Sequence, residues 1–308
     1  MTNPAITEIT SGLKFPEGPV AMPDGSVIVT ELLGGCITRV QPDGTKETVA
    51  EPGGSPNGLA IGPDGALYVA NSGGWGAHDL GGFVIPDFQQ PPHYSGGRIE
   101  RVDIGSGDVK VLYTDCDGIE LVGPNDLVFD SSGGFYFTDH GKDRGRVRTH
   151  GAIFYAAADG SSIKEVVYPL ESPNGVGLSP DGTRLYAVET HTGRVWAWTL
   201  AGPGELAGGA SMSAHGGDMI CGLPGMQLFD SLAMDSDGNV VVATLVTGAL
   251  SVISPGGELL DQFIVGDPMT TNVAFGGDDL TTAFVTLSGT GRLASFQYPR
   301  PGLQLAFG

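Results

Sequence analysis

Six polar residues recur at the same place in a repeated segment of the chain, and their side chains are suited to holding a metal ion. Each is the third residue of a segment that continues with alternating apolar residues, a turn rich in Asp and Gly, and a second apolar run. All six offer oxygen atoms and none offers sulfur, which is the donor set that hard divalent cations prefer. The pattern therefore predicts a site for one divalent cation. The six residues are Glu17, Asn57, Asn125, Asn174, Asp230 and Asn272.

Four of these residues form the expected ligand set. Glu17 and Asp230 would balance the charge of the cation. The amide oxygens of Asn125 and Asn174 would complete the protein side and leave positions open for water and substrate, as a catalytic metal requires. We expect Ca²⁺, with Zn²⁺, Mn²⁺ and Mg²⁺ as alternatives. The other two, Asn57 and Asn272, either face the substrate or hydrogen-bond the backbone of their own turns.

The repeated segments also predict the fold. Each is typical of a β-hairpin, in which a turn such as Pro63-Asp64-Gly65 joins two apolar strands. A weaker pair of strands follows each hairpin, for example residues 36–41 with residues 46–50. Four strands in each of six repeats indicate an all-β, six-bladed β-propeller with four antiparallel strands per blade, as one domain over residues 1–308. The segments are residues 15–31, 55–71, 123–139, 172–189, 228–244 and 270–286.

Propeller geometry would place the polar residues at one mouth of the central channel. The first strand of each hairpin is expected to be innermost in its blade, so the third-position residues start beside the axis. Because the hairpin returns, its last residue should lie at the same face. His140 and His191 follow two of these last residues and either shuttle protons, shape the pocket or lie in surface loops. The last residues are Glu31, Asn71, Asp139, Glu189, Thr244 and Thr286.

Residues 72–96 form the longest connection, and we expect them to be a lid over this mouth. Connections of this length are usually functional or disordered, and this one contains Trp75, Phe83, Phe88 and Tyr94. The alternative is a decoration that packs on the second blade or on a partner subunit. Together the lid and the mouth supply the expected substrate-binding residues, which are Asn57, Asn125, Trp75, His140, His191, Glu189 and Asn272.

Composition excludes several classes of function. The 308 residues include 35 Asp and Glu against 15 Lys and Arg, and the resulting net charge of −20 disfavours nucleic acid and anionic lipid as partners. Neither a signal peptide nor an apolar run of about 18 residues is visible. We therefore expect a cytoplasmic protein that binds a small molecule, with its oligomeric state open. Three widely spaced cysteines (Cys36, Cys116 and Cys221) disfavour a disulfide framework or a thiolate zinc site.

Several short motifs carry a resemblance to a known family. Pro16-Glu17-Gly18-Pro19, Pro124-Asn125-Asp126 and Pro173-Asn174-Gly175, followed by Asp230, resemble the gluconolactonase family. That family includes senescence marker protein (regucalcin) and luciferin-regenerating enzyme, and it is related to diisopropyl fluorophosphatase. The resemblance implies a six-bladed propeller whose divalent metal is held by the residues matching Glu17, Asn174 and Asp230. It places the residue matching Asn125 beside the metal or among its ligands.

Two departures from the family pattern bear on the substrate. Sugar lactonases of the regucalcin type carry an arginine two residues before the Asn-Asp pair, where this chain has Gly123. The phosphatase branch carries a histidine in its last blade, where residues 285–289 read VTLSG. A polyhydroxylated sugar lactone and a phosphotriester are both disfavoured by these differences. The aromatic lid favours a lactone with an apolar or aromatic group.

From these observations we predict a metal-dependent hydrolase that opens a lactone at the axial cation. Asp230 is the expected general base for the attacking water, with direct attack by Asp230 on the substrate as the alternative. A lyase, isomerase or dehydratase acting on a carbonyl substrate, an organophosphate hydrolase and a non-catalytic calcium-binding propeller remain as other functions. No Gly-x-Ser-x-Gly elbow and no dinucleotide-binding glycine motif is present, so serine-esterase and nicotinamide chemistry are not expected.

Overall fold

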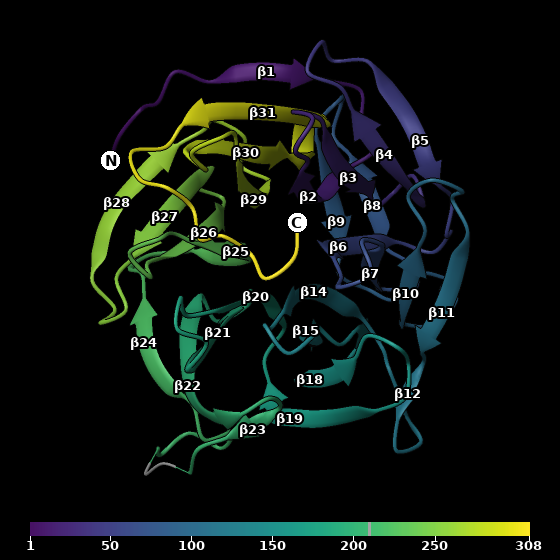
Figure 1. Ribbon diagram of the computed structural model, residues 1–308, viewed down its shortest axis with the longest axis vertical. Helices are drawn as coiled ribbons and strands as arrows, with labels where there is room; N and C mark the ends of the chain where they lie inside the picture. Colours follow the sequence, from purple (N-terminus) through teal and green to yellow (C-terminus); the bar gives the residue numbers. More distant parts are fainter. Residues whose placement is uncertain (209–210) are drawn as a thin grey trace.

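The computed structural model describes residues 1–208 and 211–308, which form β-strands joined by turns. Six antiparallel sheets of at least four strands stand around a central axis (Figure 1). The predicted six-bladed, all-β propeller is therefore confirmed. In the described part of the chain the single helical element is the 3-10 turn η1, Ser288–Thr290. No helix there is long and apolar enough to cross a membrane.

Each blade is a sheet whose strands run outward from the axis in order. The innermost strands are β2 (Pro16–Ala21), β6 (Pro56–Ile61), β14 (Pro124–Phe129), β20 (Pro173–Leu178), β25 (Leu228–Met234) and β29 (Thr270–Gly276). The second strands are β3 (Val27–Glu31), β7 (Leu67–Asn71), β15 (Gly134–Asp139), β21 (Arg184–Glu189), β26 (Val240–Leu245) and β30 (Thr282–Leu287). The third strands are β4 (Cys36–Val40), β10 (Arg98–Val102), β18 (Gly151–Ala157), β22 (Arg194–Gly202), β27 (Ala249–Ile253) and β31 (Arg292–Gln297). The outermost strands are β5 (Lys46–Ala50), β11 (Val109–Tyr113), β19 (Ile163–Leu170), β24 (Asp218–Gly222), β28 (Leu259–Ile264) and β1 (Thr7–Thr10).

Short strands decorate the connections between and within blades. β8 (Gly76–Asp79) and β9 (Val84–Asp87) form a hairpin inside the segment that was expected to be a lid. β16 (Asp143–Arg144) pairs with β17 (Val147–Arg148) in the connection after β15. The others are β12 (Asp115–Cys116), β13 (Ile119–Glu120) and β23 (Glu205–Leu206).

Every innermost strand carries a β-bulge beside its third-position residue. In the first blade the pairing register shifts between Glu17 and Val20, and the next four blades show a shift at an overlapping place. In the sixth blade the shift lies just before the third-position residue, between Thr270 and Asn272. A bulge interrupts the ladder and re-aims the side chains next to it. Neighbouring blades satisfy the backbone at this point: Oγ1 of Thr138 donates to the carbonyl of Asn174 at 2.6 Å, and Thr30 makes the same contact between the first two blades.

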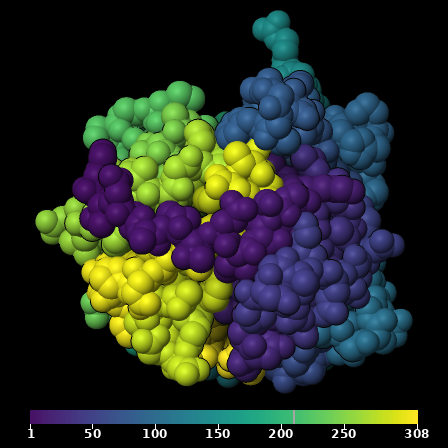
Figure 2. Space-filling view, turned by 90° about the horizontal axis from the view of Figure 1, so that it is seen from above, coloured from purple at the N-terminus to yellow at the C-terminus, as the bar shows by residue number. Residues whose placement is uncertain are grey.

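The two ends of the chain close the ring. β1 pairs antiparallel with β31, with Thr7 opposite Ser295, and so supplies the outermost strand of the last blade. Figure 2 shows the N-terminal residues crossing the rim. Before β1, the backbone of Thr2 is hydrogen-bonded to Gln262 and Ile264 in the fifth blade. No strand was expected before residue 15, so the pairing of β1 with β31 could not be predicted from the sequence.

The core lies between the faces of adjacent blades. Tyr68 of the second blade meets Phe129 and Phe135 of the third, with ring centroids 5.0 and 5.7 Å apart. Aromatic pairs at such separations add to the stabilisation that burial provides. Because each blade packs on its two neighbours, the packing holds all six innermost strands around the axis and so positions the residues at their starts.

Candidate metal centre and active site

A small cavity lies where the innermost strands begin. Its volume is about 40 Å³, and roughly 10–15 Å³ of such space is enough for one water molecule. The cavity brings together five of the six third-position residues, including all four candidate metal ligands. Its lining consists of Phe15, Glu17, Leu32, Asn57, Trp75, Pro86, Phe88, Asn125, His140, Asn174, Thr190, Asp230, Leu245 and Met269.

Hydrogen bonds hold the candidate ligands in place. Asn174 donates from Nδ2 to Oγ1 of Thr190 at 3.1 Å and accepts at Oδ1 from Oγ of Ser231 at 3.3 Å. These contacts limit the rotation of the Asn174 amide, and both Asn174 and Asp230 line the cavity.

The two carboxylates at the axis lack a compensating positive charge. Burial raises the pKa of Glu17 to about 7. Burial, reinforced by the charge of Glu17, raises the pKa of Asp230 well above its usual value. Among the described residues, no ion pair involves either carboxylate. A positive charge between them would lower both pKa values and favour the ionised carboxylates at neutral pH.

A third oxygen at the cavity is also unpaired. Oδ1 of Asn125 is buried and has no hydrogen-bond partner among the described protein atoms, which is rare for a buried acceptor. Together with Asn174 and the two carboxylates it forms an all-oxygen donor set that fits a hard divalent cation. No group of three or more His, Cys, Asp or Glu side chains is arranged to hold a metal in the ranges described. A cation at this place would therefore depend on the two amides.

Three of the predicted substrate-binding residues line the cavity besides Asn125. They are Asn57, Trp75 and His140. Burial lowers the pKa of His140 well below its usual value, and the nearby charges of His191 and Arg148 act in the same direction. His140 is therefore an uncharged imidazole at neutral pH, able to accept a proton or donate a hydrogen bond.

The other three predicted substrate-binding residues lie outside this lining. The ring of His191 is 5.0 Å from that of Phe88, a lining residue. Asn272 donates from Nδ2 to Oε2 of Glu17 at 3.1 Å. Glu189 accepts a hydrogen bond from the backbone N–H of Glu171 at 2.7 Å.

Glu189 illustrates what the last residues of the second strands do. Glu31 and Asp139 likewise accept backbone N–H groups, from Lys14 and Val122, both at 2.7 Å. In each case the donor stands two residues before the proline that opens an innermost strand. These carboxylates therefore fix the turn that leads into the ligand motif, whereas the sequence analysis placed them around the open mouth.

Sequence reasoning missed several lining residues that share one position. Leu32, Thr190 and Leu245 line the cavity, as does the predicted His140. In all four blades this residue directly follows the last residue of the repeated segment. The repeat could therefore have identified these residues, because the residue that directly follows the last residue of each hairpin lies at the channel mouth.

The segment of residues 72–96 forms the roof of the cavity. Trp75, Pro86 and Phe88 contribute to the lining, and β9 packs against η1 of the sixth blade. On the other side, Gln89 forms a β-bridge with Asp143 of the third blade. The segment therefore leaves the second blade and touches both the third and the sixth.

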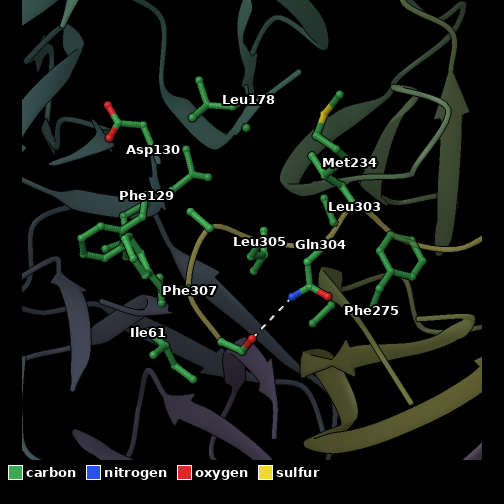
Figure 3. A pocket seen from close by; sticks show the side chains of 18 of the residues that line it. Ile61, Phe129, Asp130, Leu178, Met234, Phe275, Leu303, Gln304, Leu305 and Phe307 are labelled. Carbon is green, nitrogen blue, oxygen red and sulfur yellow. Dashed lines mark hydrogen bonds between the residues drawn. The ribbon is translucent and has the colours of Figure 1, made fainter. Parts of the chain in front are cut away.

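A second and much larger cavity occupies the opposite end of the channel (Figure 3). It has a volume of about 880 Å³ and is lined by all six innermost strands and by the C-terminal residues 303–308. Phe307 packs on Phe129 there, with ring centroids 5.7 Å apart. The lining is largely apolar and contains none of the four candidate ligands. Size alone therefore does not locate the chemistry, and the smaller cavity is the candidate site.

Known proteins match the chain over most of its length. Residues 15–289 match the family described as SMP-30/Gluconolactonase/LRE-like region. Lactonase drp35 of Staphylococcus saprophyticus is 30% identical over 244 residues, which are 78% of this chain and 67% of that protein. A gluconolactonase of Zymomonas mobilis is 26% identical over an alignment 314 positions long, which covers 92% of this chain and 79% of that protein.

A solved structure adds a likeness of fold. The crystal structure of a calcium-binding protein, regucalcin, from Agrobacterium tumefaciens matches with a TM-score of 0.70 and 18% identity, covering 96% of this chain and 99% of that one. At that identity the likeness shows the shared propeller alone. The family match over residues 15–289 and the 30% identity with Lactonase drp35 show the family as well as the fold. On this evidence the chain belongs to the SMP-30/gluconolactonase/LRE-like family.

Proposed function

We propose that this protein is a lactonase that depends on a divalent cation at the propeller axis. Glu17, Asn125, Asn174 and Asp230 would hold the cation. Ca²⁺ is the proposed ion because every donor is an oxygen and because the regucalcin of similar fold is a calcium-binding protein; Zn²⁺, Mn²⁺ and Mg²⁺ are the alternatives. The observation that carries the proposal is a pair of uncompensated carboxylates sharing one cavity with an unpaired amide oxygen.

Asp230 is the proposed general base. When bound, the cation would act as a Lewis acid on the ester carbonyl and stabilise the negative charge that develops there. Asp230 would take a proton from water as the water oxygen bonds to the carbonyl carbon. The same carboxyl would return this proton to the ring oxygen as the lactone C–O bond breaks, which yields a hydroxy acid. The position of Asp230 in the cavity lining, beside the other candidate ligands, supports this role.

Two other assignments of the chemistry remain distinguishable by experiment. Asp230 could attack the carbonyl carbon directly and form an ester that water then hydrolyses. Alternatively, His140 could act as the base, since it lines the cavity and burial keeps its pKa below the usual range.

The substrate would meet a mostly apolar wall above the ligands. Asn57, Asn125, Trp75 and His140 would contact it directly. His191 would act through Phe88, Asn272 through Glu17, and Glu189 through the turn before Asn174. These contacts favour a lactone that carries an apolar or aromatic group.

Gly123 supports the same substrate class. A Cβ atom at this position would lie 2.9 Å from the backbone carbonyl oxygen of Gly141, closer than side chains normally approach. An arginine that grips sugar hydroxyls therefore cannot stand here without a shift of that backbone. This argues against a polyhydroxylated sugar lactone as the preferred substrate.

The relatives favour a lactonase over the other functions of the same site. Lactonase drp35 and the Zymomonas gluconolactonase are both named for lactone chemistry, which speaks against a lyase, isomerase or dehydratase. Residues 285–289 lack the histidine of the phosphatase branch, which speaks against an organophosphate hydrolase. A non-catalytic calcium-binding propeller would not require the cavity over the ligands.

A proton-release assay tests the proposal. The calcium-loaded protein is tested against sugar, alkyl and aromatic lactones, with the chelated protein as control. We expect turnover of alkyl or aromatic lactones to exceed that of sugar lactones, to be lost on chelation and to return with Ca²⁺. Failure to hydrolyse any lactone, or hydrolysis that survives chelation, would contradict the proposal.

A further inference from the structure

Lys142 is a buried amine beside the roof of the cavity that the proposed mechanism does not use. Its side chain is 2% exposed. Nζ donates to the carbonyl oxygen of Gly74 at 2.8 Å and lies 4.0 Å from the ring centroid of Trp75. Carbonyl oxygens and aromatic faces both attract an ammonium group. Lys142 therefore joins the third blade to two consecutive residues of the roof.

Lys142 is held without a salt bridge to any described residue. Among the described residues no ion pair includes Lys142. Burial lowers the pKa of Lys142 to about 7, and the charge of Asp139 only partly opposes this shift. That carboxylate already accepts the backbone N–H groups of Val122, Gly123 and Gly141. The direct partners of the ammonium group are thus Gly74 and Trp75.

Trp75 is held on its remaining sides as well. Its backbone N–H donates to Oγ of Ser55 at 2.9 Å. Its ring meets the rings of Phe88 and His140 edge-on, each with centroids 5.8 Å apart. The chain enters through Gly73 at φ +75°, where a Cβ would collide with the carbonyl oxygen of Gly96. These contacts give the indole one orientation.

One polar atom of this fixed ring has no partner. Nε1 of Trp75 is buried and makes no hydrogen bond to any described protein atom, although Trp75 lines the cavity. Indole N–H is a donor only, so its partner must be an acceptor such as a carbonyl or ring oxygen of an ester. Phe15, Leu32 and Leu245 line the same cavity and offer nothing to a substrate hydroxyl.

We propose that Lys142 is a positioning residue that holds Trp75 so that its indole N–H donates a hydrogen bond to an oxygen of the substrate. The substrate class is a lactone on an apolar frame, whose ester oxygens are its main acceptors. This inference rests on the proposed function, because it takes an ester as the ligand. It extends that function by giving Lys142 a role that acts only through Trp75.

The kinetic test compares W75F, K142M, K142R and W75F/K142M on an alkyl δ-lactone at saturating Ca²⁺. W75F keeps an aromatic side chain, although a smaller one, and removes the N–H; we expect KM to rise roughly three- to tenfold with kcat little changed, as for the loss of one hydrogen bond. K142M should give a similar rise, the double variant should show no further rise, and K142R should restore part of the affinity. Rises in KM that multiply in the double variant, or no rise in K142M, would overturn the proposal.

Trp196 offers a matched control. Its Nε1 also lacks a partner, but its ring packs on His215 at 4.4 Å, away from the cavity lining. W196F should leave KM unchanged. A rise equal to that of W75F would show that loss of any unpaired indole N–H perturbs the fold, and it would overturn the assignment to Trp75.

A second readout does not need turnover. The indole N–H signal of Trp75 can be assigned in ¹⁵N-labelled protein by its absence in W75F. We expect δ-valerolactam, which keeps the acceptor oxygen but resists hydrolysis, to move this signal downfield in the wild type and K142R, and far less in K142M. An unchanged signal in the wild type, or an equal response in K142M, would overturn the inference. Failure of the proposed function would be recognised separately, as absence of wild-type turnover on every lactone.

Discussion

At the scale of single residues, the site depends on an excess of buried negative charge at the axis. Glu17 and Asp230 share one cavity with the unpaired Oδ1 of Asn125. Without a cation, burial raises the pKa of Glu17 to about 7, and burial together with the charge of Glu17 raises the pKa of Asp230, so the folded protein tends to keep a proton on this pair. A bound proton and a bound cation are therefore alternative ways to neutralise this site. The stability of the protein should depend on both pH and Ca²⁺.

The chelated protein should lose stability as pH rises from about 5 to 8. The usual pKa of Glu17 is 4.5 and burial raises it to about 7 in the folded state, so between these values the folded chain holds a proton that the unfolded chain has released. Stability then falls with rising pH, by about 1.4 kcal/mol for each unit of pKa difference. Asp230 shifts in the same direction. Calorimetry should show a falling Tm in chelator, and Ca²⁺ should raise Tm more at pH 8 than at pH 5.

The E17Q variant is the control for this effect. Glutamine removes one of the two carboxylates, so the fall in Tm between pH 5 and pH 8 should be smaller in the chelated variant than in the chelated wild type. A chelated wild type whose Tm rises through this window would show that the two carboxylates are not protonated in the folded state.

D230N and E17Q should separate the base from the ligand. Both remove one negative charge from the cation site, so both should weaken Ca²⁺ binding. At saturating Ca²⁺ we expect kcat of E17Q to recover, while kcat of D230N stays at least about 100-fold lower, the usual contribution of a general base. If both recover equally, Asp230 is only a ligand and H140Q should instead lower kcat.

The candidate ligands could be predicted from the sequence, but not every residue that contacts them. Glu17, Asn125, Asn174 and Asp230 could be predicted to meet because they share one position in a repeat, and the repeat maps onto a ring. The contact of Asn272 with Glu17 could not be predicted in this way. Its side-chain direction depends on a bulge, and a one-residue change of pairing register is invisible in an alternating pattern.

At the scale of elements, the bulges of the innermost strands are what make a ring of side chains possible. Thr138 links two of them, because its Oγ1 accepts from the N–H of Asp126 at 3.1 Å and donates to the carbonyl of Asn174 at 2.6 Å. The next residue, Asp139, accepts the backbone N–H of Val122 and so fixes the turn before β14, the innermost strand of the third blade. Thr138 and Asp139, at the end of one second strand, thus help to position the ligand motifs of the third and fourth blades.

T138V should test this support. Valine has nearly the same shape but leaves the N–H of Asp126 and the carbonyl of Asn174 unpaired and buried, so we expect a loss of about 1–3 kcal/mol in unfolding free energy. Because Asn174 is a proposed ligand, the Ca²⁺ affinity should fall as well. Chemical denaturation and calcium titration measure the two effects. A variant with wild-type stability and wild-type calcium affinity would show that the cross-blade contact does not position the site.

At the scale of the whole molecule, the ring is held closed by the N-terminal strand. Residues before position 15 carry no hairpin signal, so their pairing could not be read from the repeat. Strand β1 (Thr7–Thr10) joins β31 nearly three hundred residues later, and such a long-range pairing is set by the closed shape and not by local pattern. The six blades, in contrast, were visible in the chain because each repeats its own turn and alternation.

Removal of residues 2–11 should therefore lower Tm by more than about 5 °C, because it exposes the edge of β31 and removes the contacts of Thr2 with the fifth blade. I9D is a milder variant, since Ile9 packs against an apolar cluster of the first and last blades. Both should be measured by calorimetry with Ca²⁺ present. Unchanged Tm in both variants would show that the closure does not stabilise the ring.

The central claim is that one divalent cation is held at the axis by Glu17, Asn125, Asn174 and Asp230, and a long-wavelength anomalous map of calcium-loaded crystals tests it most directly. We predict a single strong peak within the ring, with oxygens of all four side chains about 2.3–2.6 Å away. The peak should be weaker in crystals of E17Q than in wild-type crystals at a calcium concentration that does not saturate the variant. Absence of a peak at the axis, or a peak that any two of these side chains do not reach, would contradict the account.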